Sequence, residues 1–318
     1  MDGIFNINKP VGMTSHDVVA RVRRLTRQRR VGHAGTLDPA ASGVLPICLG
    51  QATRVAEYLS ESGKRYQAAV IFGAVTDTYD AEGEVLRRAP VQVMRTQIED
   101  ALAAFLGRQM QTPPRYSAIK VAGQPLYKLA RAGVDVPLEP RPIEIFSLEV
   151  LDWQLPNLTL EVECSKGTYI RSLAYDLGER LGCGAYLGGL VRLRSGPFTL
   201  DESLKLEELE QALQDGSWIN SLYAPDEALL DHTAVIVGSA TEQRLLLGQD
   251  LSYPPPSAQA SQREGKAAHS EGKEEQAAAA PLLRAYSTDG RFLAILCWQA
   301  GARAWHPQKV LAVTPVDE

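Results

Sequence analysis

Residues 32–54 read GHAGTLDPAASGVLPICLGQATR and place one carboxylate, Asp38, in a run of small and apolar residues. Glycines stand on both sides of it, and glycine lets a backbone bend sharply or approach a ligand closely. Because Pro39 follows, the Asp38 backbone is restricted to an extended or turn conformation. A structural turn and a site carboxylate, acting as nucleophile or general base, are both consistent with this stretch. The apolar tail 44–49 predicts a core strand that fixes the loop.

The composition is that of an ordinary globular protein. The chain has 318 residues, of which 45% are hydrophobic, and this length is enough for about two domains with full cores. The net charge of −5 argues weakly against non-specific nucleic-acid binding, although a local basic patch would decide that question. The four cysteines form no CxxC pair, so neither a zinc site nor a disulfide framework is expected. We therefore predict a cytoplasmic protein without a metal, a signal peptide or a membrane span.

Local patterns predict a mixture of helices and strands. Thr14 and Asp17 match a capping box, and the apolar residues that follow recur at helical spacing. Further strands are expected over 65–72 and 158–164, and further helices over 96–106 and 170–181. Since the elements do not alternate regularly as parallel βαβ units, the pattern favours an α+β architecture.

Two other segments stand out by composition. Six arginines between residues 21 and 30 predict an amphipathic helix with a basic face, which is either solvated or bound to phosphate. Residues 254–281 hold proline, alanine, glutamine and charge with few large apolar side chains, so we predict a disordered low-complexity insertion. Short strand patterns flank this insertion. They predict two domains, over 1–230 and 231–318, of which the second is small and rich in β-structure.

Three further stretches could carry chemistry, two of them by contacting RNA and one by pairing an arginine with a carboxylate. In KRYQ (64–67), the tyrosine could stack on a base while the neighbouring cations meet phosphate, although a half-buried strand tyrosine fits equally. In SKGTYIRS (165–172), Arg171 could pair with a buried carboxylate or could be an ordinary surface arginine. The segment 113–133 interleaves basic and aromatic residues, which suits RNA contacts but also suits a mobile surface loop.

Taken together, these stretches resemble the TruB family of bacterial tRNA pseudouridine-55 synthases. The resemblance covers most of residues 1–200, and GTLDP together with KGTYIR is its most specific part. The other matching stretches are NKPVGMTSHDVV, KRYQ, TDTYDAEG, PPRYSAIKVAGQPLYKLARAG and CSKGTYIRSLAYDLGERLGCGAYL.

The resemblance implies an α+β catalytic domain with a central mixed or antiparallel sheet, followed by a PUA-like RNA-binding domain. It implies that uridine 55 in the T arm of tRNA is isomerised to pseudouridine, without a cofactor or a metal. The expected partner is tRNA, bound through its T stem-loop and acceptor end, and the expected state is a monomer.

The resemblance also implies roles for individual residues. Asp38 matches the catalytic aspartate, Tyr66 the tyrosine that stacks on the flipped base, and Arg171 the arginine that pairs with the aspartate. The residues expected to bind substrate are His33, Tyr169, Leu190, Asp80, Lys9, Lys64, Arg65 and Lys120. Lys9 is further expected to position the N-terminal loop.

Three alternatives stay open from the sequence. The guide-RNA-dependent pseudouridylase subunit of archaea and eukaryotes shares GTLDP, but it needs partner proteins. An RNA chaperone could fold tRNA without chemistry. A glycoside hydrolase would need a second carboxylate as its acid, and no motif supplies one.

Overall fold

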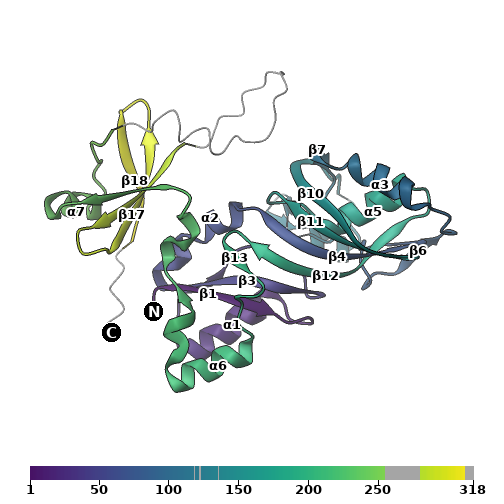
Figure 1. Cartoon of the computed structure of the whole chain (residues 1–318), viewed down its shortest axis with the longest axis horizontal. Helices are drawn as coiled ribbons and strands as arrows, with labels where there is room; N and C mark the ends of the chain where they lie inside the picture. Colours follow the sequence, from purple (N-terminus) through teal and green to yellow (C-terminus); the bar gives the residue numbers. More distant parts are fainter. Residues whose placement is uncertain (118, 122, 135, 255–279, 312–318) are drawn as a thin grey trace.

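The structure, a computed structural model, describes residues 1–117, 119–121, 123–134, 136–254 and 280–311. A large mixed sheet with helices occupies the first part of the chain, and a separate four-stranded sheet occupies the end (Figure 1). This arrangement confirms the predicted α+β fold with a small β-rich C-terminal unit. The insertion predicted over 254–281 lies, apart from its ends, outside the described residues.

The central sheet is built around one long-range junction. Its strands follow the order β14-β1-β3-β12-β4-β11-β10-β7, with β2 beside β3 and β13 beside β12. β12 pairs parallel with β3 and antiparallel with β4, so it joins the two halves of the sheet. The strands are β1 (Gly3–Lys9), β2 (Val31–His33), β3 (Ala41–Leu49), β4 (Lys64–Phe72), β7 (Gly107–Gln111), β10 (Arg141–Gln154), β11 (Asn157–Cys164), β12 (Ala185–Ser195), β13 (Phe198–Thr199) and β14 (Leu222–Tyr223).

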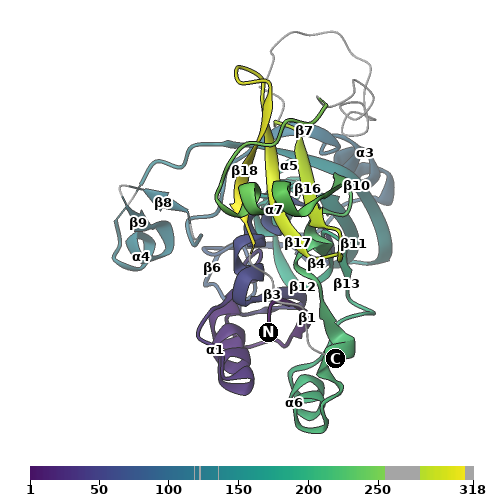
Figure 2. The same cartoon turned by 90° about the vertical axis from the view of Figure 1, so that its left-hand side faces the viewer.

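Helices cover each half of this sheet through apolar clusters. α1 (Ser15–Thr26) and α6 (Leu206–Asp215) pack with β1 and β3, whereas α3 (Arg95–Ala103) and α5 (Ile170–Arg180) pack with β4, β10 and β11. The remaining short elements are η1 (Gly50–Arg54), α2 (Ala56–Glu61), β5 (Ala74–Thr76), β6 (Val85–Arg88), β8 (Lys120–Val121), β9 (Gln124–Pro125), α4 (Leu126–Arg131), η2 (Ser217–Ser221) and η3 (Pro225–Leu229). Figure 2 shows β8, β9 and α4 standing out to one side of the body.

The predicted start of α1 is confirmed in atomic detail. The Thr14 hydroxyl accepts from the Asp17 N–H at 3.0 Å, and the Asp17 carboxylate accepts from the Thr14 N–H at 2.9 Å. Because α1 ends at Thr26 and Arg27 adopts a left-handed backbone, the later arginines lie in a turn rather than on the helix. The predicted basic helical face was therefore too long.

The helix expected over 96–106 is shorter and begins earlier than the sequence indicated. α3 runs from Arg95 to Ala103, and the Gln97 side chain accepts from the Met94 N–H at 2.8 Å. Glu99 forms an ion pair with Arg95. The residue that caps the helix is Met94, two positions before the predicted start of the helix at residue 96.

The C-terminal sheet contains β15 (Thr233–Val237), β16 (Leu282–Ser287), β17 (Phe292–Gln299) and β18 (Ala304–Val310), with α7 (Ser239–Leu246). It packs against the large sheet, since Phe292 and Ile295 share a buried cluster with Val44 of β3. Polar contacts to α2 add to this junction, including an ion pair between Lys309 and Glu57 at 2.9 Å. The two sheets are therefore joined by a mixed apolar and charged contact.

Candidate active site

The loop that carries Asp38 lies between β2 and β3, and we call residues 34–40 the Asp38 loop. Its backbone is fixed by the first residue of α1. The buried Ser15 hydroxyl donates to the Leu37 carbonyl at 3.1 Å and accepts from the Leu37 N–H at 2.9 Å. The Asp38 side chain is 44% exposed, so its carboxylate can reach a ligand. The local backbone is thus rigid where the acidic group is accessible.

The last residue of β1 and the turn that follows it also hold the Asp38 loop. The Gly12 N–H donates to the Pro39 carbonyl at 2.8 Å. The fully buried Lys9 ammonium donates to the carbonyls of Pro10, Met13 and Pro39 at 2.9, 2.7 and 3.3 Å. Burial lowers the pKa of Lys9 to about 8, and the nearby Asp38 charge opposes that shift. Since these three carbonyls match the three donors of an ammonium, Lys9 is placed to position the loop rather than to contact substrate.

A buried arginine connects two carboxylates at this site. The Arg171 Nε lies 3.0 Å from the Asp38 Oδ2, and its Nη1 lies 3.5 Å from the Asp80 Oδ2. The guanidinium also donates to the carbonyls of Tyr116 and Thr78 at 3.0 and 3.4 Å. Arg171 is only 7% exposed and lies in the first turn of α5. From the sequence, Arg171 could form a bidentate pair with one carboxylate. In the structure it instead directs one nitrogen to Asp38 and another to Asp80.

Tyr66 and Leu190 come from neighbouring strands beside this pair. On β4 Tyr66 lies opposite Arg192 of β12, and Leu190 lies opposite Ala41 of β3. Burial raises the pKa of the Tyr66 phenol, while the Arg192 guanidinium opposes this rise and the Asp38 carboxylate adds to it. Tyr66 is therefore a neutral phenol at neutral pH, and Asp38 lies near enough to affect its pKa.

His33 and Tyr169 lie at the edges of the site. The His33 Nε2 lies 3.1 Å from the Thr36 hydroxyl, and burial lowers the pKa of the ring, which is therefore neutral at neutral pH. Tyr169 precedes α5 and is held by Gln111, whose amide accepts from its N–H at 2.8 Å and donates to its carbonyl at 3.0 Å. Burial raises the pKa of Tyr169 as well. Gln111 could not be recognised from the sequence, because a single glutamine belongs to no sequence motif.

The two cations of the KRYQ stretch differ in their access to a ligand. The Lys64 side chain is 5% exposed, and its ammonium donates to the carbonyls of Ser60 and Ser62 at 2.6 and 2.5 Å. These carbonyls belong to the C-terminal end of α2, which attracts a cation. Arg65 pairs with Glu163 at 3.1 Å on β11. The phosphate contact expected of Lys64 is therefore wrong, whereas that of Arg65, whose side chain is 41% exposed, stays a prediction. The side chain of Lys120 lies outside the described residues.

Arg192 is the main component of the site that the sequence analysis did not single out. It is 1% exposed, and its Nε donates to the Val44 carbonyl at 2.7 Å. Its Nη2 donates to the Gly35 carbonyl at 2.9 Å. The signal was an arginine inside an apolar strand, GGLVRLR, where a buried charge has to be compensated by polar partners.

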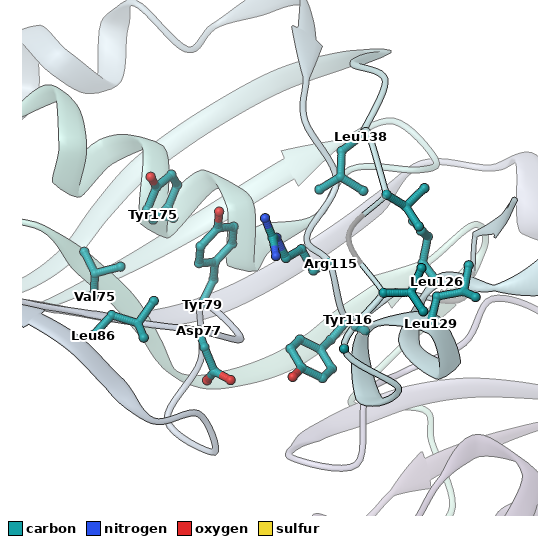
Figure 3. A pocket seen from close by; sticks show the side chains of 14 residues that line it. Val75, Asp77, Tyr79, Leu86, Arg115, Tyr116, Leu126, Leu129, Leu138 and Tyr175 are labelled. Carbon is teal, nitrogen blue, oxygen red and sulfur yellow. The ribbon is translucent and has the colours of Figure 1, made fainter.

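A pocket of about 550 Å³ adjoins the site on the side of Arg171 (Figure 3). Tyr116, whose carbonyl accepts from Arg171, is part of its lining. One wall carries the stacked rings of Tyr79 and Tyr175, with centroids 4.1 Å apart. Other lining residues are Arg115, Leu126, Leu129 and Leu138. The pocket thus combines aromatic, apolar and cationic groups, and the predicted RNA-binding segment 113–133 supplies part of it.

The described part of the chain contains no group of three or more His, Cys, Asp or Glu side chains arranged to hold a metal ion. Within those same residues, no helix is both long and apolar enough to cross a membrane. The absence of a cofactor and of a metal stays a prediction.

Comparison with family models identifies the family to which the chain belongs. The N-terminal domain model of the TruB family of pseudouridylate synthases matches residues 23–170. The model of the tRNA pseudouridylate synthase B C-terminal domain matches residues 171–231. The chain belongs to the TruB family of pseudouridylate synthases. The first model includes Asp38, Tyr66 and Asp80, and the second begins at Arg171.

Relatives from several bacteria support this membership. A tRNA pseudouridine synthase B from Geobacter sulfurreducens is 50% identical over 230 residues, which cover 72% of this chain and 76% of the relative. One from Dehalococcoides mccartyi is 40% identical over 311 residues, which cover 98% of this chain and 96% of the relative. The similarity therefore extends through the C-terminal sheet.

Solved structures show the same fold at greater distance. A chain from a complex titled Cbf5-Nop10-Gar1 has a TM-score of 0.71 at 24% identity, covering 97% of this chain and 84% of that one. A chain from an H/ACA RNP bound to a substrate RNA has a TM-score of 0.70 at 24% identity, with the same coverage. At this identity the match supports the fold alone.

Proposed function

We propose that this chain isomerises uridine 55 in the T arm of tRNA to pseudouridine, with Asp38 as the catalytic carboxylate. The observation that carries the proposal is the pairing of an accessible Asp38 with the buried Arg171 at 3.0 Å. The charged contact with the guanidinium fixes the direction of the carboxylate. The relatives named tRNA pseudouridine synthase B supply the substrate class.

The reaction breaks the C1′–N1 bond, rotates the base and forms a C1′–C5 bond. Because substrate and product are isomers, the atoms and electrons balance without a cosubstrate or a redox partner. The target base must first leave its stack, which costs a few kcal/mol. The Tyr66 ring and the Leu190 side chain would offset part of this cost by contacting the extruded base.

Asp38 would act by one of two routes. It could attack C1′ as a nucleophile, as a carboxylate does in retaining glycoside hydrolysis, or it could remove a sugar proton to give a glycal. In both routes the carboxylate must stay ionised and directed at the sugar. The Arg171 guanidinium, fixed by two carbonyls and by Asp80, supplies that direction. Tyr66 would then assist removal of the proton from C5.

The rest of the RNA would contact surfaces outside this centre. His33 and Tyr169 would touch neighbouring nucleotides, and segment 113–133 would contact RNA where it forms the pocket wall (Figure 3). We assign residues 1–230 to catalysis and the sheet in 231–318 to the acceptor end of tRNA, as a PUA-like domain. We further propose that the protein acts as a monomer in the cytoplasm, which light scattering and cell fractionation would test.

The decisive experiment uses purified protein and an unmodified tRNA transcript without any guide RNA. Pseudouridine is mapped at nucleotide resolution by chemical adduct formation and reverse transcription. We expect one modified position, uridine 55, and no product on a transcript in which that uridine is replaced by cytidine. Product at another uridine would contradict the assigned specificity, and a requirement for guide RNA would favour the guide-dependent class.

A further inference from the structure

We propose that Arg192 is a positioning residue that holds the Asp38 loop and the Tyr66 ring in one fixed arrangement. This inference rests on the proposed function, in which Asp38 and Tyr66 act on the same nucleotide. It assigns a role to a buried arginine that neither contacts solvent nor belongs to the Arg171 network.

The backbone of Arg192 lies at the junction of the two halves of the sheet. It is opposite Gly43 of β3 on one side and Tyr66 of β4 on the other. A Cβ on Gly43 would stand 2.3 Å from the Arg192 carbonyl oxygen, and Gly43 has a φ of +102°. Only glycine permits this approach, so the Arg192 backbone lies as close to the strand after Asp38 as the chain allows.

The Arg192 guanidinium ties together the two legs of the chain that flank Asp38. Upstream, its Nη2 and Nη1 donate to the carbonyls of Gly35 and Thr36 at 2.9 and 3.5 Å. Downstream, its Nε donates to the Val44 carbonyl at 2.7 Å. A planar guanidinium holds several acceptors in a more fixed geometry than a flexible ammonium does. Arg192 therefore joins the two legs of the chain, and its bonds add to those of Ser15 and Lys9, which hold the Asp38 loop between the legs.

The charge of Arg192 is not neutralised by a carboxylate. Among the described residues it forms no ion pair, and it is 1% exposed. A buried cation without a counter-charge is costly, and such groups concentrate at functional sites. The charged or titratable groups that interact with it are Tyr66, Lys9, Lys64 and His33. Of these groups, only Tyr66 becomes negatively charged when it loses its proton, so the positive charge of Arg192 favours its ionised form.

The first test compares Arg192→Met with Arg194→Met, a control on the same strand. Arg194 pairs with Glu163 at 2.5 Å and lies outside the site. In single turnover with saturating tRNA, we expect Arg192→Met to be slower by about 100-fold, because a displaced carboxylate costs about that much. The Kd of this variant for tRNA should stay within about threefold of the unsubstituted value, because the arrangement that Arg192 holds is needed in the transition state rather than for binding. We expect the rate of Arg194→Met to stay within about threefold of the unsubstituted rate. If the rate of Arg192→Met also stays within that range, the proposal is wrong.

A second measurement reports on Tyr66 directly. The tyrosine is replaced by 3,5-difluorotyrosine, whose phenol titrates at lower pH, and its ionisation is followed by ¹⁹F NMR. The groups facing the ring are Arg192 from β12, Cys164 from β11 and Asp38 from its loop. We expect the midpoint to rise in Arg192→Met and to stay near the unsubstituted value in Arg192→Lys, which keeps the charge. An equal midpoint in the unsubstituted protein, Arg192→Met and Arg192→Lys would show that Arg192 does not act on Tyr66.

Arg192→Lys also covers the case in which the methionine variant does not fold. One ammonium cannot join both legs of the loop, so the lysine variant should lose about tenfold in rate while keeping the tyrosine midpoint. A lysine variant with the full rate would remove the need for the guanidinium. If the unsubstituted protein makes no pseudouridine, the proposed function fails, whereas the fluorine titration still decides whether Arg192 acts on Tyr66.

Discussion

Replacing Asp80 by asparagine tests whether Arg171 must be shared by two carboxylates. The Asp80 Oδ2 lies 3.5 Å from the Arg171 Nη1, while its Oδ1 accepts from the Thr78 hydroxyl and the Glu82 N–H at 2.6 and 3.1 Å. Asparagine keeps an oxygen for the turn and removes only the charge. A hydrogen bond to a charged group contributes about 1.5–3 kcal/mol and a neutral one about 0.5–1.5 kcal/mol. The midpoints of these ranges differ by about 1.25 kcal/mol, which corresponds to a reaction about eight- to tenfold slower.

The assay follows tritium released from tRNA that carries [5-³H]uridine, since the C5 hydrogen must leave during isomerisation. Single-turnover rates are compared for Asp80→Asn and for Glu82→Gln, which removes an exposed charge from the same turn without an ion pair to Arg171. We expect about a tenfold loss for the first and less than about twofold for the second. Equal rates for Asp80→Asn and the unsubstituted protein would refute a shared guanidinium.

Three further perturbations follow from the site. Asp38→Asn should abolish tritium release and leave the tRNA Kd within about threefold, and normal turnover would disprove its catalytic role. Gly43→Ala should lower the free energy of unfolding by about 3 kcal/mol, whereas Gly189→Ala, with its nearest atom at 3.8 Å, should cost less than about 1 kcal/mol. Burial lowers the pKa of Lys9 to about 8, so the folded chain loses this proton before the unfolded chain does. Urea titrations should show stability rising between about pH 8 and 10 relative to Lys9→Met, and parallel pH profiles would contradict this.

Most of the local structure could be predicted because it rests on short-range patterns. The strand 158–164 alternates buried and exposed residues as its sequence indicated, and the Thr14 cap closes α1. These two features depend on residue type and spacing within a few positions, which a single sequence displays. The pairing of Arg171 with Asp38 joins distant segments, and it was expected only from the resemblance to the family.

The errors concern side chains whose environment comes from distant segments. Lys64 reads as a surface cation beside an aromatic residue, yet the end of α2 covers it and supplies its acceptors. Arg192 reads as one of several arginines in an apolar strand, yet its partners lie in the Asp38 loop. Neither placement is visible in local periodicity, because both depend on which strands become neighbours in the sheet.

The position of β12 between β3 and β4 determines when the protein becomes competent during its synthesis. Gly35 leaves the ribosome 157 residues before Arg192, the side chain that holds it. In the large sheet as described, β12 is the strand that links β1, β2 and β3 on one side to β4, β7, β10 and β11 on the other. Contacts of such large sequence separation form late in folding. Catalytic ability therefore arises in a single late event, the insertion of one strand, rather than growing with the length of the chain.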